Sequence, residues 1–179
     1  MTSLVIPISS DADDVSVPVS LQAELLVKVA QYDRNFTTRA GERVQILLVV
    51  KPGNSNSAYV ASQMEASLAR ITQIAGLPHD EAVVSYPGAA ELVKLCRSHR
   101  AAIVFFGPGF HDDVEAIRAA LTDVDILSAT GVPDYVPGGI VLGFDVVSGR
   151  PKLLVHLTQA KRQNVALRAE ALKLMKVFE

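Results

Sequence analysis

The segment Val44-Gln45-Ile46-Leu47-Leu48-Val49-Val50 carries our prediction of the fold. It is almost continuously apolar and rich in branched side chains, and Ala101-Ala102-Ile103-Val104-Phe105-Phe106 repeats this character later in the chain. Strands of a parallel sheet have such sequences because helices cover both faces of the sheet. Both runs are far shorter than the roughly 20 apolar residues that a membrane-spanning helix needs. They therefore predict two central strands of a parallel sheet.

Outward from these two strands, apolar residues recur at helical spacing. The spacing predicts helices over residues 21–32, 60–74, 89–96 and 114–121, and shorter strands over 82–85 and 124–127. Gly76 is the expected stop of the second helix. Asp112 and Glu115 resemble a capping box at the start of the fourth. Strands that alternate with helices in this way predict right-handed βαβ units.

The pattern changes after residue 138. Gly139–Val147 and Lys152–Leu157 are predicted strands, and the turn Ser148-Gly149-Arg150-Pro151 between them predicts an antiparallel hairpin. Apolar spacing from Ala160 to Phe178 predicts one final helix. We therefore expect an α/β fold, a three-layer α/β/α sandwich whose mostly parallel sheet ends in an antiparallel hairpin and a final helix. Residues 18–179 form this single domain; residues 1–17 are a flexible lead-in, part of which (Leu4 to Ile8) could add an edge strand.

The composition excludes several classes of protein. The chain has 179 residues, of which 49% are hydrophobic and 20% charged, so a buried core is expected and disorder is not. The formal net charge of −2 gives no whole-molecule attraction to nucleic acid or to an anionic membrane. The single cysteine, Cys96, excludes an internal disulfide and a cysteine-rich metal site. Cys96 falls on an apolar helical stripe, which favours a buried thiol over a reactive pair with His99.

Candidate site residues gather at the expected carboxyl ends of the strands, where open α/β sheets bind ligands. His111 and Asp112 suit a metal ion or proton transfer, but the helix dipole also favours acidic residues in a first helical turn, and no second ligand cluster is evident. We therefore predict no catalytic residue, no metal ligand and no cofactor. The expected ligand or partner surface comprises Asn54, Ser55, Phe110, His111, Asp112, Thr130 and Tyr135.

Three glycines at the start of the predicted hairpin need a physical explanation. Gly138, Gly139 and Gly143 cost a strand conformational entropy and side-chain packing. Close approach of another backbone, of a ligand or of a dimer mate would offset this cost. A β-bulge would do so equally well.

The last third of the sequence carries the most specific motif. It runs through Ile126-Leu127-Ser128, the glycine-paired strand Gly138-Gly139-Ile140-Val141-Leu142-Gly143-Phe144 and the turn Gly149-Arg150-Pro151-Lys152-Leu153, and it continues into Ala160–Val177. Through these residues the chain resembles the YfiR-like family. The resemblance covers residues 20–178, and its specific part is this last third.

The resemblance implies a small, non-enzymatic α/β protein of the periplasm. Members of the family bind the sensor region of a membrane diguanylate cyclase and hold the cyclase inactive, which couples cyclic-di-GMP signalling and biofilm formation to envelope conditions. Relatives often have cysteine pairs, whereas this chain has only Cys96, so redox control through an internal disulfide is not expected. Thr37-Thr38 also stand where relatives continue with aromatic residues.

Two function hypotheses from different classes follow. The first is a regulatory protein-binding module, a homodimer and not an enzyme, that occupies the sensor domain of a membrane diguanylate cyclase and binds no nucleic acid. The alternative is a receptor for a small anion, nucleotide or amino acid that uses the crevice at the strand ends. The family implies a periplasmic location, whereas Met1–Pro7 shows no secretory signal, which leaves a removed signal or a cytoplasmic protein as the expectation.

Overall fold

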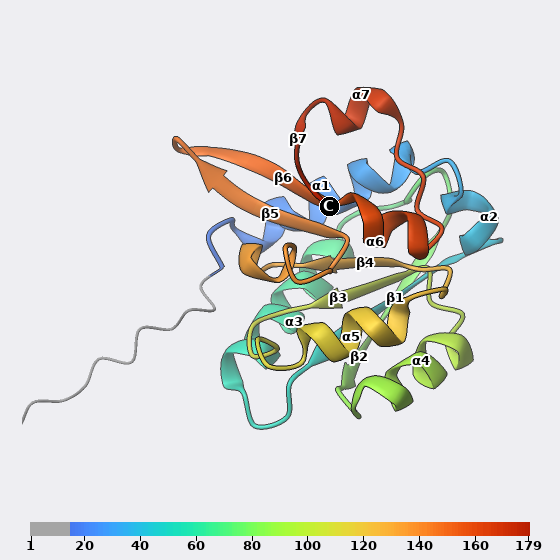
Figure 1. The fold of residues 1–179 in the computed structure, drawn as a ribbon. Coiled ribbons are helices and arrows are strands. Elements are labelled where there is room, and N and C mark those ends of the chain that lie inside the picture. The colour runs from blue at the N-terminus through green and yellow to red at the C-terminus, as the bar shows by residue number, and fades with distance from the viewer. Residues whose placement is uncertain (1–14) are drawn as a thin grey trace, which may run out of the picture.

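Over residues 15–179, which this computed structural model describes, the chain folds around a seven-stranded sheet of order β2-β1-β3-β4-β5-β6-β7 (Figure 1). The strands are β1 (Val44–Val50), β2 (His79–Ser85), β3 (Ile103–Phe106), β4 (Leu127–Thr130), β5 (Leu142–Val147), β6 (Arg150–His156) and β7 (Met175–Phe178). The helices are α1 (Val19–Tyr32), α2 (Phe36–Ala40), α3 (Ser55–Leu68), α4 (Ala89–Ser98), α5 (Val114–Leu121), the 3-10 helix η1 (Pro133–Tyr135), α6 (Leu157–Arg162) and α7 (Ala169–Leu172). The expected edge strand over Leu4 to Ile8 lies outside the described residues.

Strands β1 to β5 are parallel, as the alternation of strands and helices predicts. β1 is an inner strand whose Ile46 is in register with Glu81 of β2 on one side and with Ile103 of β3 on the other. The path from β1 through α3 leads to β2, and the path from β2 through α4 returns past β1 to β3. The strand order therefore reverses between β1 and β3, and the carboxyl ends of such a pair form the customary ligand crevice of open α/β folds.

Alternate residues of β1 enter two separate cores, one on each face of the sheet. Ile46 and Leu48 belong to the core beneath α1 and α3, and Leu47 belongs to the core beneath α4 and α5. Successive side chains of a strand point to opposite faces, so a strand covered on both sides must be apolar throughout. Figure 1 shows α5 in front of the sheet and α1 behind it. The three-layer α/β/α prediction is confirmed.

The predicted antiparallel hairpin is also confirmed, and it makes the sheet mixed. Its bounds differ from the prediction, because β5 begins at Leu142 and not at Gly139, and β6 begins at Arg150 and not at Lys152. β5 and β6 pair antiparallel, from Leu142 with Val155 to Val147 with Arg150. Ser148 and Gly149 form the turn, with φ values of 52° and 73°. A two-residue loop with both residues in the left-handed region matches the twist of the flanking strands.

The single final helix predicted over Ala160 to Phe178 is wrong. α6 ends at Arg162, α7 is one short turn, and β7 pairs in parallel with β6 at the edge of the sheet. Asn164, with φ 56°, and the extended Arg168 interrupt the helical path. The apolar spacing resembled that of one helix although its residues belong to separate elements: Ala160 of α6 and Met175 of β7 are buried in the same core.

Other predicted boundaries also shift. Asn54 caps α3 by accepting a hydrogen bond from the Ser57 N–H at 2.8 Å, so the helix begins at Ser55, earlier than expected. It also ends earlier, at Leu68, and Gly76 therefore lies in a later turn and does not end the helix. The capping box at Asp112 is wrong: α5 begins at Val114 after the N-cap Asp113, which makes no side-chain capping bond. β4 begins at Leu127, where 124–127 was expected.

Candidate functional site

The switch point between β1 and β3 is closed by side chains of the chain itself. Lys51, the residue after β1, donates a hydrogen bond from Nζ to Oδ2 of Asp113 at 2.5 Å. The ammonium group also lies 5.5 Å from the ring centre of Tyr86 and 5.9 Å from that of Phe110. Burial, and secondly the charge of Asp113, raise the pKa of Tyr86, so its phenol stays neutral beside this ion pair. An ion pair flanked by two rings occupies the customary ligand crevice.

The loop after β3 fits directly against the loop after β1. Gly109 has φ 97°, and a Cβ atom there would lie 2.6 Å from Nδ2 of Asn54 and 3.1 Å from Cβ of Lys51. Only glycine permits both the backbone conformation and this approach. The Asn54 side-chain oxygen already accepts the hydrogen bond that caps α3, and Ser55 is exposed at the first position of that helix.

Phe110 and Thr130 lie beneath the surface. Both are fully buried, so the expectation that they line an open crevice is wrong. The Phe110 backbone N–H donates to the Tyr135 hydroxyl at 2.9 Å, and Thr130 Oγ1 accepts from the Val132 N–H at 3.0 Å. These residues fix the loops that follow β3 and β4.

A hollow of about 310 Å³ opens at the same edge of the sheet, between α5 and η1. We call it the carboxyl-edge hollow. It is lined by His111, Val114, Glu115, Arg118, Asp134, Tyr135 and Gly138. Of these residues, His111, Glu115 and Asp134 are exposed, and the Arg118 guanidinium lies 3.8 Å from Oε1 of Glu115. The hollow therefore presents one guanidinium group, two carboxylates and an imidazole to solvent.

Two of the predicted surface residues, His111 and Tyr135, meet in this hollow, together with Gly138, one of the three glycines predicted to allow a close approach. Tyr135 contributes from beneath, because its ring is buried and its hydroxyl accepts from Phe110. Asp112 is exposed and is not among the lining residues. The sequence did not single out Arg118 or Asp134, because nothing in their spacing shows that α5 packs against η1.

The three glycines are explained by close approach within the chain. A Cβ atom at Gly138 would lie 2.5 Å from Cγ1 of Val114, and one at Gly139, where φ is 114°, would lie 2.3 Å from Cδ of Arg118. A Cβ atom at Gly143 would lie 2.4 Å from Cγ2 of Val136. The groups that approach are side chains of α5 and of the segment after η1. Gly138 and Gly139 therefore let the segment after η1 lie directly against α5, and Gly143 lets β5 lie against Val136.

His156 lies near the same helix. Burial is the main cause that lowers its pKa, and the positive charge of Arg118 adds to it. Nδ1 of the neutral ring accepts a hydrogen bond from the Gln159 N–H at 3.2 Å and so caps α6. Protonation of Nδ1 would remove this acceptor.

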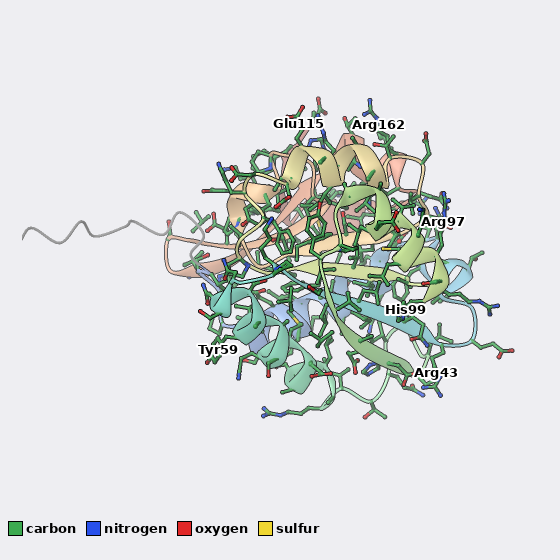
Figure 2. The ribbon with its side chains drawn as sticks, turned by 90° about the horizontal axis from the view of Figure 1, so that it is seen from below. Arg43, Tyr59, Arg97, His99, Glu115 and Arg162 are labelled. Carbon is green, nitrogen blue, oxygen red and sulfur yellow. The ribbon has the colours of Figure 1, made fainter. Side chains whose placement is uncertain are left out.

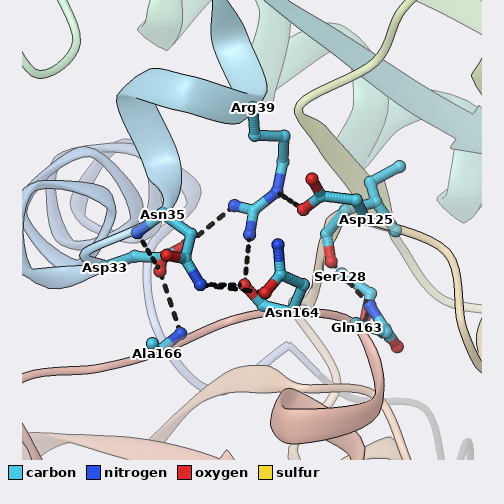
Figure 3. A network of polar contacts seen from close by, with 9 residues as sticks. Asp33, Asn35, Arg39, Asp125, Ser128, Gln163, Asn164 and Ala166 are labelled. Atoms are coloured by element: carbon cyan, nitrogen blue, oxygen red, sulfur yellow. Dashed lines mark hydrogen bonds and ion pairs between the residues drawn. The ribbon is translucent and has the colours of Figure 1, made fainter.

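A polar network that the sequence analysis missed lies near the opposite, amino ends of the strands (Figure 3). Arg39 pairs with Asp33 at 2.7 Å and with Asp125 at 2.6 Å, and it donates to the Asn164 carbonyl oxygen at 2.9 Å. Oδ1 of Asp33 accepts from the Ala166 N–H at 2.9 Å. The network joins segments far apart in the sequence, so no local spacing reveals it.

The thiol of Cys96 is buried, as predicted. Burial raises its pKa to about 11, which keeps it protonated and unreactive at neutral pH. His99 is exposed at the end of α4.

Two further observations concern the described part of the chain. Within residues 15–179, no group of three or more His, Cys, Asp or Glu side chains is placed to hold a metal ion. No helix in this part is long and apolar enough to cross a membrane.

Comparison with known proteins gives fold neighbours only. No protein-family model matches the chain, and no curated protein matches it either. Among solved structures, a conserved domain protein from Vibrio cholerae is similar with a TM-score of 0.60 at 14% identity, over 90% of this chain and 60% of that protein.

Two other solved structures, both of named proteins, are also similar. A substrate-binding protein with adhesive properties from Clostridium difficile, in its ligand-free, open form, has a TM-score of 0.59 at 12% identity, over 91% of this chain and 60% of that one. An ABC domain in complex with L-Trp from Streptococcus pneumoniae has a TM-score of 0.55 at 11% identity, over 84% of this chain and 62% of that one. The chain thus spans about three fifths of the length of the proteins whose fold it shares.

Proposed function

We propose that this chain is a small-ligand binding domain that takes a zwitterionic molecule of the amino-acid class in the carboxyl-edge hollow. The observation that carries the proposal is the placement of Arg118 in one hollow with Glu115 and Asp134. A guanidinium group binds a carboxylate with two parallel hydrogen bonds, and a carboxylate binds an ammonium group. The two charges of an amino acid match this set.

The solved structures support this class of ligand. One of the similar proteins is titled a substrate-binding protein, and another was determined with L-Trp. The volume of about 310 Å³ lies at the lower end of ligand pockets, which range from about 300 to 1,000 Å³. Because His111, Glu115 and Asp134 are exposed, a ligand there keeps one side toward solvent, and we expect a dissociation constant nearer to millimolar than to nanomolar.

The experiment is a thermal-shift screen of amino acids, nucleotides and inorganic anions. A ligand at free concentration c that binds only the folded protein raises the free energy of unfolding by RT ln(1 + c/Kd), so the melting temperature rises with the logarithm of its concentration once the site is largely filled. We expect amino acids to raise it and Asp134→Asn or Arg118→Gln to abolish the rise. The matched control is Arg70→Gln, because Arg70 is exposed on the chain after α3. A flat screen, or a rise that both site variants retain, contradicts the proposal.

A second candidate function rests on a different surface. Val147 of the hairpin is 49% exposed, and Leu174, before β7, is 69% exposed. Beside them lies a groove of about 460 Å³, the hairpin groove, lined by Leu25, Val147, Arg150, Pro151, Lys152, Leu153 and Leu174. Adjoining exposed apolar residues are typical of surfaces that bind another protein. Figure 1 shows the β5–β6 hairpin projecting beyond the rest of the sheet.

This surface fits a regulatory protein-binding module of the YfiR-like type. Such a module, homodimeric and periplasmic, would occupy the sensor region of a membrane diguanylate cyclase and would make or break no bond. We expect Val147→Asp together with Leu174→Asp to abolish capture of the cyclase from solubilised membranes. Val83→Asp is the matched control, because Val83 is 45% exposed on the opposite edge strand β2. Equal capture by the double variant and the control contradicts this candidate.

A further inference from the structure

A second hollow lies near the amino ends of the central strands, at the opposite end of the sheet from the carboxyl-edge hollow. It measures about 400 Å³ and is lined by Arg39, Cys96, Arg97, Arg100, Ala101, Asp123, Val124, Asp125 and Ile126. We call it the amino-edge hollow. Figure 2 shows Arg97 and His99 at the end of α4, on the same side of the molecule as Arg43.

The arginines of this hollow differ in what they contact. Arg39 is buried and its guanidinium group is already paired with Asp33 and Asp125. Among the hydrogen bonds and ion pairs of residues 15–179, none involves the side chains of Arg97 or Arg100. Two arginines whose guanidinium donors have no partner among the described residues therefore line one cavity.

The backbone at Arg100 adds a second observation. Arg100 follows the C-cap of α4 with φ 50°, and the Ala101 N–H donates to the Cys96 carbonyl oxygen while the Arg100 N–H donates to that of Arg97. This is a Schellman motif, and its left-handed position is the one that glycine favours most strongly. A long charged side chain stands there at a conformational cost.

Asp123, on the other wall, repeats the pattern. The Val124 N–H donates to the Leu121 carbonyl oxygen at 3.0 Å, and Asp123 has φ 65° in this turn. With Thr122 extended at φ −60° and ψ 130°, the turn is of type II, whose third residue is usually glycine. Two charged residues thus occupy glycine positions on the walls of one cavity.

We propose that the amino-edge hollow binds a small ligand through two negative charges held between Arg97 and Arg100. The two charges belong either to a phosphate group or to a pair of carboxylates. Guanidinium groups are suited to both chemistries because their planar forks bind two oxygens at once. A neighbouring hollow of about 510 Å³, which shares Arg39 and Arg100, leaves room for the rest of the ligand.

The test is isothermal titration of the full chain with inorganic phosphate and, separately, with succinate. We expect at least one of them to bind and Arg97→Gln with Arg100→Gln to weaken that binding at least tenfold. The control carries the same change of charge elsewhere, Arg34→Gln with Arg70→Gln, at two exposed positions outside both hollows. Binding of phosphate alone or of succinate alone identifies the chemistry. Binding of neither, or equal binding by the two double variants, overturns the proposal.

A further variant separates folding from binding. Arg100→Gly places glycine at the left-handed position, so we expect the melting temperature of the free protein to rise by about 2–4 °C while binding of the anion weakens. Arg97→Gln, which leaves the turn unchanged, should weaken binding without that rise. Unchanged binding in both single variants overturns the assignment of the two arginines.

Discussion

The two ends of the sheet each hold an ion pair, and burial separates their roles. The side chains of Arg39 and Asp33, at the amino end, are 3% and 0% exposed. Those of Lys51 and Asp113, at the carboxyl end, are 33% and 23% exposed. A buried charge that loses its partner is left without any compensating interaction, which costs the folded state much free energy. A partly exposed charge that loses its partner is still hydrated by water, so the loss is small. The amino-end pair therefore maintains the fold, and the carboxyl-end pair mainly fills the switch point.

The largest effect is expected from Arg39→Met. The substitution leaves the Asp33 carboxylate buried without its counterion, so we expect the free energy of unfolding in urea to fall by about 3–5 kcal/mol. Lys94→Met is the control, because the Lys94–Glu91 pair is exposed and should contribute close to nothing. A loss below 1 kcal/mol for Arg39→Met would remove the distinction between the two ends.

A smaller loss is expected from Gly139→Ala, beneath the carboxyl-edge hollow. The new methyl group meets the Arg118 side chain at 2.3 Å and stands at φ 114°, so we expect destabilisation by about 1–3 kcal/mol in the same assay. Gly88→Ala isolates the backbone contribution, because Gly88 has a similar φ of 100° but nothing lies within 4 Å of its Cβ position. Equal losses in the two variants would show that contact with α5 does not matter.

Lys51→Met should cost about 1 kcal/mol, less than Arg39→Met, because both partners of the ion pair are partly solvated. The methionine removes the charge that lies beside the rings of Tyr86 and Phe110 and keeps an unbranched side chain. Urea denaturation in low and high salt checks the assignment, since salt should reduce the difference between variant and parent. A loss as large as that of Arg39→Met would contradict the comparison.

The smallest effect concerns pH. The pKa of His156 is lowered by burial and by Arg118, so the unfolded chain binds its proton more readily than the folded one. Stability is therefore fully present above the unfolded pKa of about 6.5 and declines as the pH falls below it. His156→Gln should flatten this decline, and the exposed His99→Gln should leave it unchanged. A decline that His156→Gln retains in full assigns the pH dependence to another group.

The sequence predicts the parallel part of this fold well because one physical rule governs it. Val44–Val50 is covered on both faces, and its almost continuous apolar run indicates that directly. The prediction of one C-terminal helix is wrong for the opposite reason. The apolar residues at helical spacing there belong to three elements, α6, α7 and β7, and the last of these is a strand because it pairs with β6, a contact that local spacing does not show.

The location of the carboxyl-edge hollow was predictable from the sequence, but only some of its lining residues were. The carboxyl edge follows from topology, and His111, Tyr135 and Gly138 meet there. Arg118 joins them only because Gly138 and Gly139 let η1 approach α5, a contact that no local spacing encodes. Phe110 was misplaced because an aromatic residue in a loop resembles a binding residue until its burial is known.

The central claim is that a small zwitterion binds in the carboxyl-edge hollow, and chemical-shift mapping tests it most directly. Amide resonances of the ¹⁵N-labelled chain would be followed while amino acids are titrated in. We predict that saturable shifts concentrate at Arg118, Asp134 and Gly138 and leave Val147 and Arg97 unchanged. Amide shifts confined to the hairpin or to the amino edge, or the absence of saturable shifts with every amino acid, would contradict the claim.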